Sequence, residues 1–200
     1  FFQNVDDNNL FISQRLVDSK VSHLTPGSGA DLGKFSPAIR PPDNQITFLL
    51  IGRMLWDKGV GEFVEAATVV RSKIKNAKFQ LLGPLGVENR TAISNAQMAD
   101  WVKEGVVEYL GETDCVGAYI EKASCVVLPS YREGTSRVLL EAAAMGRPII
   151  STDVTGCREI VDHRENGFLC KPGDAIDLAK QMKKMIELAS AARQEMGRTG

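Results

Sequence analysis

The sequence predicts an α/β protein: a doubly wound, mainly parallel sheet of about six strands with helices on both faces. Beyond residue 45, short apolar runs alternate with segments whose apolar residues recur at helical spacing. The short runs are apolar on both faces, as is typical of parallel strands covered by helices on each side. Alternation of this kind implies right-handed βαβ crossovers and a Rossmann-like sheet.

Six runs read as strands, and the segments between them read as helices. The predicted strands are 47–53, 78–82, 106–110, 125–128, 148–152 and 167–170. The predicted helices are 60–70, 91–103, 116–123 and 178–189, of which 91–103 has the weakest apolar pattern. Thr113 is the expected N-cap of the third helix, and Asp174 opens the last one.

The first 40 residues have a different character. Asp6 to Asp18 predicts a helix that Asp6 and Asp7 would cap, and Val21–Leu24 predicts a short strand. The stretches 25–32 and 37–42 are rich in turn residues, so we predict a domain boundary near residue 40. Because the chain lacks an initiator Met and stops soon after a helix, we expect it to be a piece of a longer protein.

The composition of the chain argues against several classes of function. A net charge of −1 without a basic tract gives no indication of nucleic-acid binding. The longest apolar run, Ile46 to Gly52, is far too short to span a membrane, and no signal peptide is evident. The four cysteines lack a C-x-x-C pair and are interpreted as reduced thiols of a cytosolic protein. Neither His23 nor His163 has a partner at metal-ligand spacing, so we expect no metal site.

Doubly wound sheets bind ligands beyond the carboxyl ends of their strands, where three segments of this chain fall. The first is Gly52–Gly59, which contains Arg53 and Lys58. Two cations near a helix start can hold a diphosphate, the arginine through its bidentate fork and the lysine as a point charge. The alternative is that both are solvated loop charges.

The second segment carries Glu133 and Glu141 from a strand-to-helix turn into the following helix. Thr135 or Ser136 can cap that helix and leave backbone N–H groups for an oxyanion. Glu133 can accept hydrogen bonds from ligand hydroxyls, and Glu141 can accept two from vicinal hydroxyls such as those of a ribose. Alternatively, Glu133 is an ordinary loop acid and Glu141 pairs with Arg137 at i,i+4. The apolar surroundings of Glu141 favour the functional interpretation.

The third segment, Ser151–Glu159, has Gly156 where a helix is expected to begin. It can also line the crevice, although such a loop is more often simply the next connection of the sheet.

With these residues in view, the chain resembles the donor-binding, C-terminal half of retaining GT-B glycosyltransferases, the large family that builds bacterial surface polysaccharides and lipid-linked glycans. The resemblance covers about residues 45–200. Its motifs occur in order and are Gly52-Arg53 with Lys58-Gly59, Leu81–Gly83, Tyr109–Gly111, Leu128–Ser130, Glu133-Gly134 with Glu141-Ala142, Met145–Asp153, Gly156–Glu159 and Asn166–Leu169.

The resemblance implies a role for each site residue. Arg53, Lys58 and Glu133 would be catalytic, the two cations holding the donor diphosphate and Glu133 the sugar hydroxyls. Glu141 would hold the ribose, and the loop at Leu110-Gly111 would meet the nucleobase through its backbone. The donor-binding set implied is Gly52, Arg53, Lys58, Leu110, Gly111, Glu133, Gly134, Thr135, Ser136, Arg137, Val138 and Glu141.

It also implies an activity and partners. The donor would be a nucleotide-diphospho-sugar, by family habit a UDP-sugar, used by a hexosyl- or N-acetylhexosaminyl-transferase without a metal or other cofactor. Residues 1–40 would be the tail of the N-terminal acceptor domain plus the interdomain linker, and 41–200 a donor domain truncated at its C-terminus. Alone, this piece would be inactive. The acceptor would be a lipid-linked glycan. The enzyme would be cytoplasmic, and peripheral association with the inner face of the cytoplasmic membrane is compatible with the resemblance.

One departure concerns the donor sugar: many family members carry Phe-Gly where this chain has Thr135-Ser136.

Two alternative functions share the architecture. One is a sugar-nucleotide 2-epimerase, against which the Glu133–Glu141 spacing and the Gly52–Gly59 loop both weigh. The other is a non-catalytic domain that only binds nucleotide sugars, against which the joint presence of Arg53, Lys58, Glu133 and Glu141 weighs.

Overall fold

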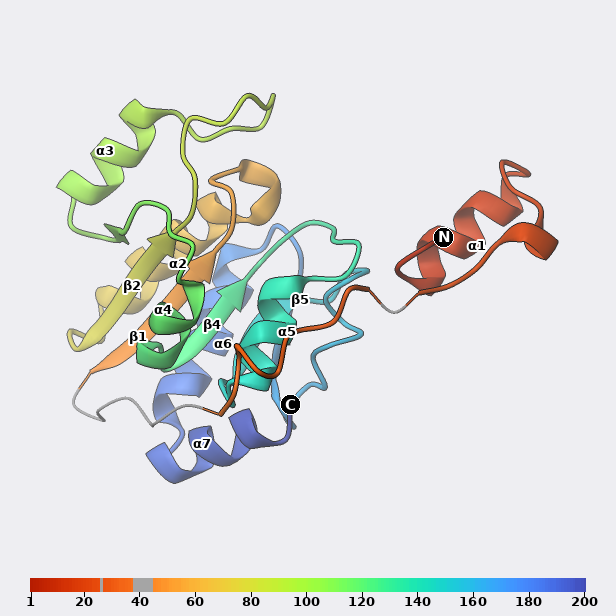
Figure 1. The fold of residues 1–200 in the computed structure, drawn as a ribbon. Helices are drawn as coiled ribbons and strands as arrows, with labels where there is room; N and C mark the ends of the chain where they lie inside the picture. The colour runs from red at the N-terminus through yellow and green to blue at the C-terminus, as the bar shows by residue number, and fades with distance from the viewer. Residues whose placement is uncertain (26, 38–44) are drawn as a thin grey trace.

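A computed structural model describes residues 1–25, 27–37 and 45–200, and its centre is a six-stranded parallel sheet (Figure 1). The strands are β1 (Ile46–Ile51), β2 (Ala77–Leu82), β3 (Glu108–Tyr109), β4 (Cys125–Leu128), β5 (Ile149–Thr152) and β6 (Gly167–Cys170). Their order across the sheet is β3-β2-β1-β4-β5-β6. Strand order reverses at β1 and β4, as in the doubly wound folds that bind dinucleotides. The predicted fold class is confirmed.

Helices and 3-10 turns connect the strands. They are α1 (Val5–Ser13), η1 (Ser19–Val21), η2 (Trp56–Lys58), α2 (Val60–Arg71), α3 (Asn95–Lys103), α4 (Val116–Lys122), α5 (Arg137–Ala144), α6 (Ala175–Glu187) and α7 (Ser190–Arg198). The helices predicted at 60–70, 91–103, 116–123 and 178–189 correspond to α2, α3, α4 and α6.

Two apolar cores lie on opposite faces of the sheet. In β1, Phe48 and Leu50 face the core shared with α2 and α6, whereas Leu49 and Ile51 face the core shared with α4 and α5. This alternation follows from the two-residue period of a strand. All four side chains are buried, which explains why the strand reads as a continuous apolar run. Figure 1 shows α4 and α5 on one side of the sheet and α2 and α6 on the other.

The predicted strand at 106–110 is wrong in length. Only Glu108 and Tyr109 pair with β2, opposite Gln80 and Leu81, so β3 is a two-residue strand at the edge of the sheet. Val107 is buried without joining the ladder. Its apolar character comes from packing in the core rather than from strand pairing.

Of the two helix N-caps predicted at Asp174 and Thr113, the structure confirms only the first. The Asp174 side chain accepts from the backbone N–H of Asp177 at 2.8 Å, so its predicted place at the start of α6 is confirmed. The predicted N-cap Thr113 is wrong, because α4 begins one residue after Cys115. The Thr113 hydroxyl instead accepts from the Cys115 N–H at 3.0 Å, which stabilises the turn before the helix.

The helix expected after Gly156 does not form, and residues 155–160 make a series of turns instead. Asn166 ends this segment: its amide donates to the Ile160 carbonyl at 2.8 Å, and its side-chain oxygen accepts from the Asp162 N–H at 2.9 Å. These bonds compete with helical ones for the same backbone groups.

The N-terminal predictions need correction. Asn4, not Asp6 or Asp7, caps α1, and the helix ends at Ser13, before Arg15 adopts a left-handed φ of 58°. The strand predicted at 21–24 is absent: Asp18 instead caps the 3-10 turn η1, and Leu24 makes only an isolated bridge to Phe2. The predicted boundary near residue 40 and the prolines at 41 and 42 lie outside the described residues.

No helix in the described ranges is long and apolar enough to cross a membrane. All four cysteines are free thiols; Cys115 is exposed and the other three are buried.

Candidate functional site

The site lies where β1, β4 and β5 end and their loops meet. After β1 the chain passes through η2 to Gly59, whose φ of 72° is left-handed. A Cβ added there would lie 2.1 Å from the carbonyl oxygen of Pro129, which follows β4. Only glycine lets the two loops approach so closely. The backbone N–H of Tyr131 also donates to the Asp57 carbonyl at 2.9 Å.

The loop after β4 is also joined to the loop after β5 by backbone hydrogen bonds. The Glu133 N–H donates to the Thr155 carbonyl at 3.1 Å, and the Ser136 N–H donates to the Gly156 carbonyl at 3.2 Å. Gly156 has a φ of 82°, and a Cβ there would lie 2.3 Å from the Glu133 carbonyl oxygen. The third predicted segment, Ser151–Glu159, therefore fixes the backbone of the loop that carries Glu133.

Lys58 and Glu133, distant in the sequence, form an ion pair in this site. The ammonium of Lys58 lies 2.6 and 2.7 Å from the two carboxylate oxygens of Glu133. Both side chains are largely shielded from water, with 21% and 12% of their surfaces exposed. Partial burial makes such a charge-assisted pair stronger than one on the open surface. It orients both groups before any ligand arrives.

A cavity of about 280 Å³ opens beside this pair. It is lined by residues from the ends of β1 and β4 and from the start of α5. Many of the predicted donor-binding residues are among them: Gly52, Arg53, Lys58, Glu133, Thr135, Ser136, Arg137 and Val138. The sheet topology thus brings the two predicted cations and one predicted acid to a single hollow.

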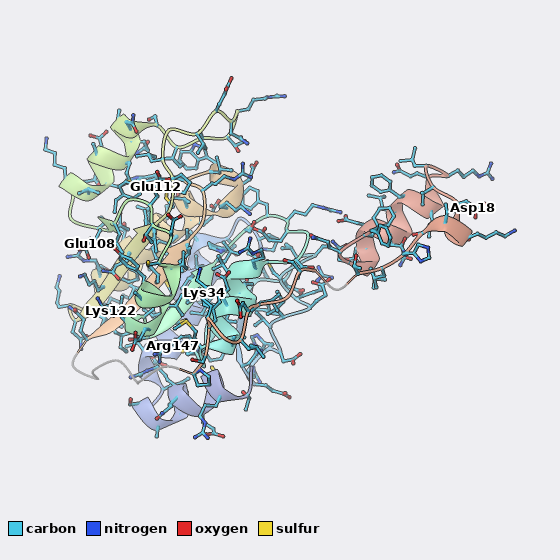
Figure 2. The ribbon with its side chains drawn as sticks, in the orientation of Figure 1. Asp18, Lys34, Glu108, Glu112, Lys122 and Arg147 are labelled. Atoms are coloured by element: carbon cyan, nitrogen blue, oxygen red, sulfur yellow. The ribbon has the colours of Figure 1, made fainter. Side chains whose placement is uncertain are left out.

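A second cavity of about 420 Å³ adjoins the first, since Ile51, Gly52 and Arg53 line both. Its far wall consists of Glu112, Thr113 and Asp114, the three residues that follow the predicted Leu110-Gly111. Gly111 itself accepts from the Gly83 N–H at 2.7 Å and fixes this loop to the end of β2. Figure 2 shows Glu112 on the side of α4 that faces α3. Residues 112–114 follow the end of β3 as Leu110 and Gly111 do, and that position in the sequence is the signal that indicates them.

The start of α5 leaves backbone donors free. Ser136 occupies the N-cap position, but its side chain makes no capping bond. The Thr135 hydroxyl donates to the Gln3 carbonyl at 3.1 Å instead of capping the helix. The predicted side-chain cap is therefore absent. Within the described residues, no side-chain capping bond reaches the first N–H groups of α5, which can bind an anion.

Glu141 lies one helical turn beyond Arg137 and is 6% exposed. Burial raises the pKa of its carboxyl, and the nearby charges of Arg137 and Lys34 partly oppose that shift. An Arg137 guanidinium nitrogen lies 3.5 Å from a Glu141 carboxylate oxygen, so the i,i+4 pair considered as the alternative is present. The arginine is mostly exposed, however, and does little to offset the cost of burying the acid. Lys34 lies near α5 in Figure 2.

The first residues of the chain contact the Glu133 loop, which the sequence did not reveal. The Asn4 amide donates to the Gly134 carbonyl at 3.0 Å, and the Thr155 hydroxyl donates to Asp6 at 2.6 Å. Asp7 forms an ion pair with Arg132. Neither composition nor periodicity indicates contacts between segments more than 120 residues apart.

Among the described residues, no group of three or more His, Cys, Asp or Glu side chains is arranged to hold a metal ion. His163 uses its Nδ1 to accept from the Leu169 N–H at 2.9 Å, a bond that joins the turn before β6 to that strand.

Comparison with known proteins places this geometry in a family. Residues 45–188 match the family model described as glycosyl transferases group 1. An N-acetylgalactosaminyltransferase of Campylobacter jejuni, which acts on N,N'-diacetylbacillosaminyl-diphospho-undecaprenol, is 33% identical over 145 residues. That alignment covers 72% of this chain and 36% of the relative. The capsular polysaccharide glycosyltransferase CapM of Staphylococcus aureus is 29% identical over 150 residues, covering 75% of this chain and 39% of CapM.

Solved structures share the fold. HepE of Anabaena, solved in complex with UDP-glucose, superposes with a TM-score of 0.81 at 20% identity, over 98% of this chain and 56% of that one. The C-terminal domain of LpcC, a group 1 family protein from Francisella tularensis, gives a TM-score of 0.71 at 23% identity, over 86% of this chain and 94% of that domain.

The chain spans less than two fifths of the length of the two curated relatives described. It belongs to the group 1 glycosyl transferases, and its fold is that of the Rossmann-like C-terminal half of their GT-B architecture.

Proposed function

We propose that this chain binds the nucleotide-diphospho-sugar donor of a retaining glycosyltransferase. The observation that carries the proposal is the convergence of Arg53, Lys58, Glu133 and the start of α5 on one cavity. A diphosphate needs cations and N–H donors, and a sugar needs acceptors for its hydroxyls. This cavity offers both kinds of group side by side.

In this arrangement the diphosphate lies between Arg53 and the start of α5. The free N–H groups and the helix dipole favour an anion there. Glu133 accepts from the hydroxyls of the donor sugar. The ribose lies toward Glu141, and the base enters the second cavity beside Gly111. HepE of Anabaena was solved in complex with UDP and with UDP-glucose, which supports a UDP-sugar as the donor.

The reaction is transfer of the sugar with retention of its anomeric configuration. The bond from the anomeric carbon to the diphosphate oxygen breaks, and its electron pair leaves with the diphosphate. A bond to the acceptor oxygen forms, and the proton of the acceptor hydroxyl passes to an oxygen of the leaving diphosphate. Charge develops on the leaving group, so Arg53, Lys58 and the helix N-terminus lower the barrier. This chemistry needs no metal ion.

The acceptor site belongs to the rest of the protein. The Campylobacter jejuni relative acts on N,N'-diacetylbacillosaminyl-diphospho-undecaprenol, and CapM is a glycosyltransferase of capsular polysaccharide biosynthesis. We therefore infer a lipid-linked glycan acceptor and a hexosyl- or N-acetylhexosaminyl-transferase that works in the cytoplasm at the inner face of the membrane. On its own, the 200-residue chain would bind donor without turning it over.

A thermal-shift screen of nucleotide sugars on the 200-residue chain tests donor binding. A ligand present at a hundred times its Kd should raise Tm by about 5–10 °C, because it binds only the folded state. The shift should be the same with and without EDTA. Calorimetry should then show weaker UDP binding by Glu141→Ala. If no nucleoside diphosphate or nucleotide sugar binds the wild type, the proposal is wrong.

A further inference from the structure

The start of α1 rests on the loop that carries Glu133. Asn4, Asp6 and Asp7 each contact residues between Arg132 and Thr155. These contacts come from the N-cap and the first turn of the helix. Figure 2 shows Asp18, beyond the other end of the helix, far from the sheet. The segment thus contacts the loops beside the candidate site through the first turn of α1 and the residues just before it.

Asn4 is the centre of this contact. Its side-chain oxygen accepts from the Asp7 N–H at 2.7 Å, which caps α1. Its amide group donates to the Asp7 carboxylate at 2.8 Å and to the Gly134 carbonyl at 3.0 Å. The residue is 4% exposed, so losing any of these bonds would leave a buried polar group without a partner. The amide cannot be flipped, because both acceptors face its nitrogen.

Asp7 is held by the same arrangement. Burial alone would raise the pKa of its carboxyl, but hydrogen bonds from Asn4 and Arg132 and the charge of Arg132 bring the pKa below its ordinary value. Asp7 is therefore a charged group at neutral pH that links Asn4 to the residue preceding Glu133.

Glu133 is then fixed from three directions. Lys58 holds its carboxylate, and the Thr155 carbonyl holds its backbone N–H. Asn4 holds the carbonyl of Gly134, the next residue. A group that must grip a sugar in one orientation needs supports of this kind, because a displacement of about 1 Å can cost about a hundredfold in rate.

We infer that Asn4 is a positioning residue for the donor sugar: by holding the Gly134 carbonyl, it orients the Glu133 carboxylate toward the sugar hydroxyls. This inference rests on the proposed donor-binding function. It assigns a role in the donor site to a residue outside the stretch 45–188 that matches the family model.

The test uses Asn4→Ser with Asn9→Ser as the matched control. Serine at position 4 can still cap α1, but it has no amide to reach the Gly134 carbonyl. Asn9 lies on the same helix and is exposed. Each variant is compared with the wild-type 200-residue chain in calorimetric titrations with UDP-glucose and with UDP. A melting curve of each variant establishes that it is folded.

Asn4→Ser should weaken UDP-glucose binding about five- to tenfold, the size expected for one hydrogen bond, and leave UDP binding unchanged. Asn9→Ser should change neither. In a Glu133→Gln background, Asn4→Ser should have little further effect, because the asparagine acts through that carboxylate. Equal weakening of UDP and UDP-glucose, or full additivity of the two changes, would overturn the inference.

A second measurement needs no ligand. Hydrogen exchange of the backbone amides of residues 131–138 should be faster in Asn4→Ser than in the wild type or Asn9→Ser. Unchanged exchange would overturn the inference even if the donor function holds. Faster exchange in a chain that binds no nucleotide sugar would instead place the failure in the proposed function.

Discussion

Glu141 is a buried carboxylate, and its burial is costly to the stability of the fold. It lies beside Leu139 and Ala142, the two buried apolar residues of α5. A salt bridge to an exposed arginine contributes at most about 1 kcal/mol, whereas burying a carboxylate costs more than that. A chain selected for stability alone would carry an apolar residue or a glutamine here. The proposed contact of Glu141 with the ribose would account for an acid kept at the expense of stability.

The pH dependence of stability checks this argument. Because burial raises the folded-state pKa of Glu141 above its ordinary value of 4.5, the folded chain binds this proton more tightly than the unfolded chain. The favourable effect of protonation is present at low pH and is lost as pH rises through the raised folded value. Glu141→Gln should therefore gain in Tm relative to the wild type as pH rises from about 4 to about 8.

Melting curves of both proteins across that range give the difference directly. Glu195→Gln serves as the control, since Glu195 is an exposed acid on α7. A Glu141→Gln difference that stays flat or falls with pH would contradict the argument. Donor binding should move in the opposite direction, with UDP bound more weakly by Glu141→Gln than by the wild type.

At the scale of the elements, the approach of the η2 loop to the β4–α5 loop depends on one glycine. Gly59 combines a left-handed φ of 72° with the 2.1 Å approach of the Pro129 carbonyl oxygen to an added Cβ. Alanine would carry both the left-handed strain and a clash with a backbone atom. Gly105 has a similar φ of 69° but nothing within 4 Å, so alanine there carries the strain alone.

Gly59→Ala should lower the free energy of unfolding by about 3 kcal/mol or more, and Gly105→Ala by about 1 kcal/mol. Urea denaturation of the two variants and the wild type measures both. Since Lys58 precedes Gly59, Gly59→Ala should also weaken UDP binding, while Gly105→Ala should not. Equal destabilisation by the two substitutions would show that the close contact with Pro129 is relieved at no cost.

Elements with a local cause were predictable from the sequence. The strands at 125–128 and 167–170 have the predicted bounds, and all of β4 and three of the four residues of β6 are buried. Asp174 caps α6 because the capping bond is local. Elements decided by distant partners were not. β3 is short because only two of its residues meet β2, and the turns after Gly156 replace a helix because Asn166 competes for the backbone.

The same distinction applies to the site. Gly52, Arg53, Lys58 and Glu133 follow strand ends, and parallel topology brings strand ends together, so their convergence could be predicted. The ion pair between Lys58 and Glu133 could not, because it depends on side-chain reach across two loops. Asn4 gave no signal at all, because its partner Gly134 lies 130 residues away in the sequence.

At the scale of the whole molecule, the apolar cores and the N-terminal support for the Glu133 loop come from different parts of the chain. Both cores are built from residues between Phe35 and Met196, whereas α1 buries none of its own residues. Residues 1–25 contact the body chiefly through polar bonds to the Glu133 and Thr155 loops. Removing them should therefore affect the site far more than the cores.

A chain that begins at Gly27 should unfold in a single cooperative transition. Its Tm should fall by less than about 8 °C, because the lost polar contacts contribute about 2 kcal/mol at most after the entropy of ordering them is included. Its affinity for UDP-glucose should fall at least as far as that of Asn4→Ser, while its affinity for UDP should be nearly unchanged. Calorimetry and circular dichroism on the same samples measure both properties. A broad, non-cooperative transition would mean that the N-terminal segment belongs to the folding unit, and unchanged UDP-glucose affinity would mean that the Glu133 loop holds its geometry without Asn4.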